Sequence, residues 1–217
     1  MFERITRREE ADLFVAWIAI SLAFAIIFLR EAGRASLLLA LAFIGISLLT
    51  VGIGFILHEM AHKFTAIKYG YWAEFRKDNI MLVVAVALAA LVGVVFAAPG
   101  ATVIYSNAGD GRGLSREENG KISASGPVVN LVLCIPFAIL VMLAGQGPSL
   151  GDNILYMIGM IGFQVNAMIA AFNMLPVSVL DGKKVWSWNK LVFIVLIALA
   201  FAALVLSFYP STLASLI

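Results

Sequence analysis

The sequence predicts an all-α membrane protein, a polytopic helical bundle of five to six membrane segments. Hydrophobic residues make up 62% of the 217-residue chain and charged residues only 13%, and the mean hydropathy is +1.00. A soluble domain has about 45–50% apolar and about 25% charged residues, so this composition indicates a lipid environment. Two further observations support the same class: a series of long apolar runs, and the clustering of Lys and Arg between them.

Five apolar runs have the length of about 20 residues that a transmembrane helix needs. They are residues 13–29, 35–57, 127–145, 153–175 and 191–209. The helix over the second run is expected to continue to residue 69. The first run follows a basic segment similar to a signal peptide. It is longer than the usual 7–15 residues and leads directly into Arg30, so it is expected to be a retained span.

A sixth apolar run, residues 80–98, is expected to re-enter the membrane or to lie in its interface. Lys and Arg favour cytoplasmic loops. If this run does not cross, all fifteen Lys and Arg residues except Arg30 and Arg34 lie on one side of the membrane. If it crosses, the two sides carry almost equal numbers. The charge pattern therefore predicts a multi-pass cell-membrane protein with a cytoplasmic N-terminus.

The two histidines of the chain lie in the motif HEMAH, directly after the second apolar run. On an α-helix His58 and His62 share one face, and two imidazoles so placed can hold Zn²⁺ at about 2.0–2.1 Å. Glu59 lies beside them, where it can act on a water molecule at the metal. Such groups at the end of a membrane span are costly and indicate function. The alternative is that the span ends at Leu57 and leaves a solvated amphipathic turn.

A third zinc ligand is expected to be a carboxylate, because catalytic zinc sites usually have three protein ligands. The single cysteine, Cys134, is isolated in an apolar run and can form no disulfide framework. Among the carboxylates Asp181 stands out, because Pro176 ends the preceding helix and Gly182 allows a close approach of the backbone. This segment by itself leaves two interpretations open: a metal ligand, or a cap for the next helix.

A short β-prone run, residues 102–105, follows the Pro99-Gly100 turn and predicts a strand. Non-helical backbone at membrane depth must be covered by protein or line a wet cavity. Two roles remain open for it: a packing strand that covers the metal-binding helix, or an edge that pairs with a substrate.

Three motifs, taken in order, resemble the site-2 protease family of intramembrane zinc metalloproteases. The family patterns are HExxH, GPxxN and NxxPxxxxDG. This chain has HEMAH from His58, SGPVVN over residues 125–130, and NMLPVSVLDG over residues 173–182. The resemblance implies one zinc ion per chain, with ligands His58, His62 and Asp181. It also implies that Glu59 is the general acid and base.

The charge pattern and the β-prone run together predict a re-entrant or short β element near the active site. The resemblance implies a substrate-binding or oxyanion-stabilising role for Asn173 and Asn130. Residues 1–217 are then expected to form a single integral-membrane metalloprotease domain. Its partners would be the lipid bilayer and a transmembrane protein substrate, cleaved near the cytoplasmic face. The net charge of +2 is too small to favour a nucleic-acid partner.

The alternative is a membrane zinc-binding protein without protease activity, either a scaffold or a metal transporter. A transporter should carry acidic or His residues along several spans, whereas here such residues are expected at a single membrane depth. A scaffold should have lost part of the site, and all of its parts remain. A membrane protease that uses a later Glu as third ligand is disfavoured, because no Glu follows Glu118.

Overall fold

The computed structural model describes residues 5–33, 36–93, 95, 100–105, 113–144, 154–177 and 179–209. The elements follow in the order α1 (Arg7–Glu31), α2 (Leu37–Lys68), β1 (Trp72–Lys77), α3 (Asn79–Leu91), β2 (Gly100–Tyr105), α4 (Arg116–Ala144), α5 (Ile154–Asn173), α6 (Asp181–Trp188) and α7 (Lys190–Ser207).

Five of these helices, α1, α2, α4, α5 and α7, are long and apolar enough to cross a membrane. The prediction of an all-α polytopic membrane protein is therefore confirmed. Each of the five overlaps one predicted apolar run, although residues 35, 145 and 153 lie outside the described residues. α2 continues past its apolar run to Lys68, and both histidines on it are buried. The HEMAH motif is therefore part of a continuous helix and not a solvated turn.

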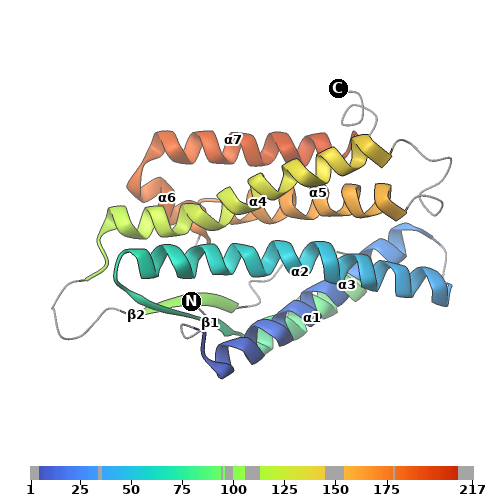
Figure 1. The fold of residues 1–217 in the computed structure, drawn as a ribbon, viewed down its shortest axis with the longest axis horizontal. Coiled ribbons are helices and arrows are strands. Elements are labelled where there is room, and N and C mark those ends of the chain that lie inside the picture. Colours follow the sequence, from blue (N-terminus) through green and yellow to red (C-terminus); the bar gives the residue numbers. More distant parts are fainter. Residues whose placement is uncertain are drawn as a thin grey trace.

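The helices lie roughly side by side in the order α1, α2, α4 with α5, and α7 (Figure 1). Small residues bring the central pair close together. A Cβ atom on Gly162 of α5 would lie 2.2 Å from the Phe137 ring of α4, and one on Gly159 would lie 2.9 Å from Val141. Close approach of this kind is how helices pack in a membrane, where burial of apolar surface adds little.

α4 begins well before its apolar run, because a capping box starts it. Ser115 Oγ accepts a hydrogen bond from the Glu118 N–H at 3.2 Å, and Glu118 Oε2 accepts one from the Ser115 N–H at 3.1 Å. This reciprocal pair satisfies two backbone donors at the start of the helix. The first turns of α4 are polar and can therefore line a wet site at the end of the bundle.

A two-stranded antiparallel sheet lies against α2, and in Figure 1 α2 lies between the sheet and the first turns of α4. β1 pairs with β2 from Trp72↔Tyr105 to Lys77↔Gly100. The predicted strand over residues 102–105 is present in β2, whereas its partner β1 was not predicted. Because Lys77 and Gly100 face each other, the intervening segment begins and ends at one point.

That segment contains α3, a helix that packs along α1 (Figure 1). Its 13 residues extend about 20 Å, less than the hydrocarbon core of about 30 Å. Arg30 of α1 donates hydrogen bonds to the carbonyls of Ala89 and Ala90 at the end of α3. The Ala89 carbonyl also accepts a hydrogen bond from the Gly93 N–H at 3.1 Å. Arg30 therefore adds a side-chain donor at the end of α3, where helix carbonyls lack the usual intrahelical partners. Of the predicted run 80–98, residues 94 and 96–98 lie outside the described residues.

A buried ion pair joins the sheet and α1 to α2. Lys63 Nζ contacts Glu9 Oε2, and both side chains are fully buried. The other carboxylate oxygen of Glu9 accepts a hydrogen bond from the Phe75 N–H of β1 at 2.9 Å. Removing one member of a buried pair leaves an uncompensated charge, which is strongly destabilising. This node therefore connects three elements directly after the HEMAH motif, since Lys63 follows His62 in the chain.

The first testable prediction concerns this node. Lys63→Met is expected to lower the free energy of unfolding by about 3–5 kcal/mol, because Glu9 is left buried without its partner. The double variant Glu9→Gln/Lys63→Met removes both charges and keeps an acceptor for the Phe75 N–H, so it should recover much of the loss. Thermal unfolding in detergent, followed by circular dichroism, measures both. A Lys63→Met protein as stable as the wild type would contradict the prediction.

Candidate metal centre

Two imidazoles on α2 face one another with their Nε2 atoms 3.0 Å apart. His58 Nδ1–H donates a hydrogen bond to Asn130 Oδ1 at 2.6 Å, and His62 Nδ1–H donates one to the Ile122 carbonyl at 2.8 Å. Both acceptors come from α4. A hydrogen bond at Nδ1 fixes the tautomer and leaves the Nε2 lone pair available for a metal.

Asp181 is the first residue of α6, and its carboxylate completes the group. Oδ2 lies 3.4 Å from His58 Nε2 and 3.1 Å from His62 Nε2. The side chain does not cap α6, whose N-cap residue is Leu180. Burial opposes the charged form, but the imidazoles, when protonated, lower the pKa of the Asp181 carboxyl below its usual range through the charge of His62 and hydrogen bonds from His58 and His62. Asp181 is therefore available as a carboxylate.

The spacing of these atoms suits one zinc ion. Ligand atoms about 2.0–2.1 Å from zinc at tetrahedral angles lie roughly 3.3 Å apart, and the three separations here are 3.0, 3.1 and 3.4 Å. Gly126 of α4 leaves the room that an ion needs. A Cβ atom there would lie 2.5 Å from His62 Nε2 and 2.6 Å from His58 Nε2.

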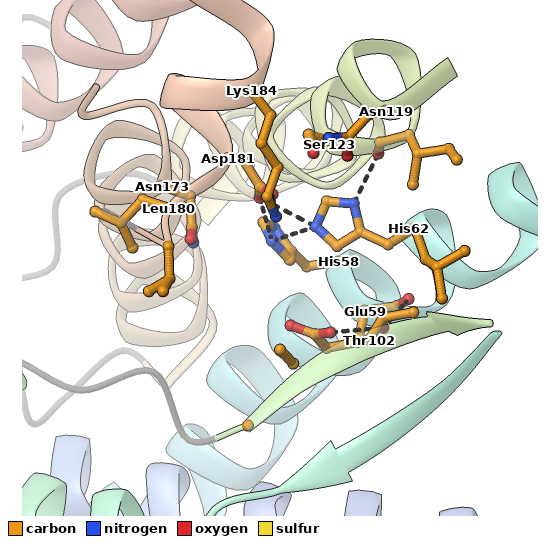
Figure 2. Close-up of a pocket in the computed structure, with 15 residues that line it drawn as sticks. His58, Glu59, His62, Thr102, Asn119, Ser123, Asn173, Leu180, Asp181 and Lys184 are labelled. Carbon is orange, nitrogen blue, oxygen red and sulfur yellow. Dashed lines mark hydrogen bonds and ion pairs between the residues drawn. The ribbon is translucent and has the colours of Figure 1, made fainter. Parts of the chain in front are cut away.

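The predicted base, Glu59, lines the same pocket, which has a volume of about 100 Å³ (Figure 2). Its side chain is directed toward β2, where Thr102 Oγ1 donates a hydrogen bond to Glu59 Oε2 at 2.8 Å. The opposite wall carries Asp181 and Lys184, whose ammonium lies 3.7 Å from Asp181 Oδ1. The predicted zinc ligands, the Glu59 carboxylate and a cation therefore surround one small cavity.

The two predicted asparagines lie in different environments. Asn130 is fully buried, and besides accepting from His58 it donates to the Gly54 carbonyl at 3.2 Å and to Asn166 Oδ1 at 2.8 Å. Asn173 lines the pocket at the end of α5 and donates from Nδ2 to the Ile169 carbonyl at 3.0 Å. Asn173 therefore lies where a substrate can reach it, whereas the amide of Asn130 is occupied within the protein.

Sequence reasoning missed three residues of this site. Thr102 was recognised only as part of a β-prone run, Lys184 only as one of many cationic residues, and Gly126 only as a letter in a motif. Each is recognised by a contact between elements far apart in the chain, which no local pattern contains. The single threonine in GATVIY was a weak signal for Thr102.

A comparison with curated proteins identifies the family. A protein of Methanocaldococcus jannaschii named "Putative zinc metalloprotease MJ0611" is 38% identical over 190 residues, which cover 88% of this chain and 89% of that protein. This chain belongs to the same family of zinc metalloproteases. No family model and no solved structure matches it. The buried His58, His62 and Asp181 cluster of this metalloprotease, found among the described residues, suits its zinc ion.

The second testable prediction concerns the room for zinc. Gly126→Ala is expected to abolish stoichiometric zinc binding, because the added Cβ would lie 2.5 Å from His62 Nε2 and 2.6 Å from His58 Nε2 and would take the space of the ion. Gly45→Ala is the matched control, since a Cβ at Gly45 of α2 meets nothing within 4 Å. Metal content of the purified variants, measured by inductively coupled plasma mass spectrometry, distinguishes them. Full zinc occupancy in Gly126→Ala would contradict this description of the site.

Proposed function

We propose that this metalloprotease is an intramembrane protease of the site-2 protease type, which hydrolyses peptide bonds of transmembrane proteins. The observation that carries the proposal is the position of the buried metal cluster on membrane helices. His58 and His62 belong to α2 and their hydrogen-bond partners to α4, and both helices are long and apolar enough to span. A soluble metalloprotease has no need to build its site on such helices.

The convergence of the three sequence motifs supports the family assignment. HEMAH on α2, SGPVVN on α4 and the Asp-Gly pair at the start of α6 all meet at one pocket. In the family pattern these motifs carry the metal ligands and the residues around them. Here the Gly of the second motif leaves space beside the imidazoles, and its Asn holds one of them.

We propose His58, His62 and Asp181 as the zinc ligands. The bound zinc would supply a Lewis acid that polarises the scissile carbonyl and lowers the pKa of water. Asn130 then orients His58, and the Ile122 carbonyl orients His62. Partners of this kind are worth about 10–100-fold in metal affinity or activity. Asn130 thus acts on a ligand, which differs from the substrate contact that the family resemblance implied.

We propose Glu59 as the general base and acid. Its carboxylate lines the pocket on the same helical turn as the ligands, so it can accept a proton from the attacking water. The carbon–nitrogen bond then breaks as Glu59 returns that proton to the leaving amine. Asn173 on the pocket wall has one amide N–H beyond the bond to its own helix, and this can donate to the developing oxyanion.

The proposed chemistry requires a substrate that is locally unwound. In an α-helix the peptide N–H and C=O groups are bonded to one another, so the scissile group has to leave the helix before the base and the metal can reach it. The pocket wall supplies a candidate acceptor for the unwound segment. Pro127 has no N–H, so the Ser123 carbonyl in the pocket wall lacks its usual helical donor.

We propose that residues 80–98 re-enter the membrane, and that the site faces the cytoplasm. The pairing of Lys77 with Gly100 supports this, because a segment with adjacent ends returns to the side from which it left. α4 and α5 then contribute two crossings between the HEMAH motif and Asp181, which keeps all ligands at one depth. The Lys and Arg pattern favours the cytoplasm for that side.

A zinc transporter is less well supported. Transport across the membrane requires polar or charged groups at several depths. Within the described ranges, His58, His62 and Asp181 form one group of metal-binding side chains, and no second group of three follows it along the spans.

The third testable prediction separates catalysis from metal binding. Glu59→Gln is expected to abolish cleavage of a membrane-spanning test substrate and to leave zinc content unchanged, because the ligands remain and the base is lost. Asp181→Ala should lower zinc content as well as activity. Activity near the wild-type level in Glu59→Gln would exclude Glu59 as the base.

The fourth testable prediction concerns topology. Single cysteines are introduced into a Cys134→Ser background at Lys68, Gly113, Lys183 and Glu31, all of which are exposed. An impermeant thiol reagent should label the first three from the cytoplasmic face and Glu31→Cys from the opposite face. Labelling of Gly113→Cys together with Glu31→Cys would mean that residues 80–98 cross the membrane.

A further inference from the structure

We infer that Thr102 of strand β2 is a positioning residue that holds the carboxylate of Glu59 in its working orientation. This inference rests on the proposed function, because it concerns the residue proposed there as the base. It adds a residue outside the three sequence motifs, and it assigns a mechanistic role to the small sheet.

The contact itself is direct and well formed. Thr102 Oγ1 lies 2.8 Å from Glu59 Oε2 and 3.2 Å from the Glu59 backbone carbonyl. In the part of the chain that the structure describes, no other hydrogen bond reaches the Glu59 side chain. Hydrogen bonds to an ionised acceptor are about twice as strong as neutral ones. With Oε2 held by Thr102, Oε1 is the oxygen available to a water molecule in the pocket.

A glutamate base needs such a restraint. Its side chain has three rotatable bonds and would otherwise sample several rotamers within a pocket that also contains two imidazoles. A base must lie within hydrogen-bond reach of the proton that it accepts. Misplacement by about 1 Å can lower the rate by about 100-fold. A single well-placed donor therefore affects the chemical step without contacting the metal.

The sheet can serve as the support for this donor because it is fixed to the bundle. Thr102 pairs with Phe75 of β1. The Phe75 N–H donates to buried Glu9 of α1, and the Phe75 ring packs edge-on against Phe55 of α2 at a centroid distance of 5.6 Å. The hydroxyl is thus carried by a strand tied to two helices. β2 also lines the pocket from Gly100 to Ile104, so the same strand borders both the base and the substrate space.

The experiment compares Thr102→Val, Thr102→Ser and Thr50→Val in the full chain, reconstituted in liposomes with a membrane-spanning test substrate. Thr102→Val removes the hydroxyl and keeps the shape, so kcat should fall roughly 10–100-fold while KM and zinc content stay unchanged. Thr102→Ser keeps the hydroxyl and should recover most of kcat. Thr50→Val is the matched control, because Thr50 is a buried threonine of α2 whose hydroxyl, among the residues that the structure describes, donates only to the Ile46 carbonyl.

A wild-type kcat in Thr102→Val, or no recovery in Thr102→Ser, would overturn the inference. Loss of zinc in Thr102→Val would also overturn it, since the role would then be structural. Thr102→Ala is measured in parallel and replaces the valine variant if that protein does not fold. Failure of the proposed function is seen separately, as a wild-type protein that does not cleave or a Glu59→Gln protein that does.

Discussion

Three candidate metal-binding atoms, from two segments far apart in the chain, lie within 3.0–3.4 Å of one another, and the architecture follows from bringing them together. The imidazoles project from the last third of α2, and the carboxylate lies at the first residue of α6. Between them the chain forms the sheet with α3, then α4 and α5. These intervening elements have to bring the chain back to the membrane depth of the two histidines. The adjacent ends of the β1–α3–β2 unit make that possible without a further crossing of the membrane.

The polar groups of the bundle are arranged so that few are buried without a partner. Asn130 connects His58 to Asn166 and to the backbone of α2, and Glu9 connects Lys63 to the backbone of β1. In an apolar environment each such group would be expensive if it stood alone. These chains of contacts therefore fix how the helices pack at the site, and they allow ionisable groups to persist among apolar helices.

The two-stranded sheet poses a different problem from these buried side chains, because it brings non-helical backbone to the edge of a helical bundle. Such backbone is tolerated where it is covered by protein or lines a cavity. β1 is covered by α1 and α2, and β2 lines the pocket. β2, the strand that was predicted, also contacts α2, the helix that carries the histidines, and its Thr102 adjoins Glu59, the proposed base. A role as a pairing edge for substrate stays a prediction.

The sequence by itself determined the membrane class, the five spans, the two histidines and their glutamate, and the order of the motifs. These depend on local composition and on helical periodicity, which are visible over a few turns. For Asp181 the sequence left two roles open, a metal ligand or a cap for the next helix, because both roles have the same local pattern. The tertiary structure brings its carboxylate to the imidazoles and leaves α6 without a side-chain cap. It also decided the partners of Asn130 and Thr102 and the pairing of Lys77 with Gly100, since these contacts join segments whose separation along the chain says nothing of their distance in space.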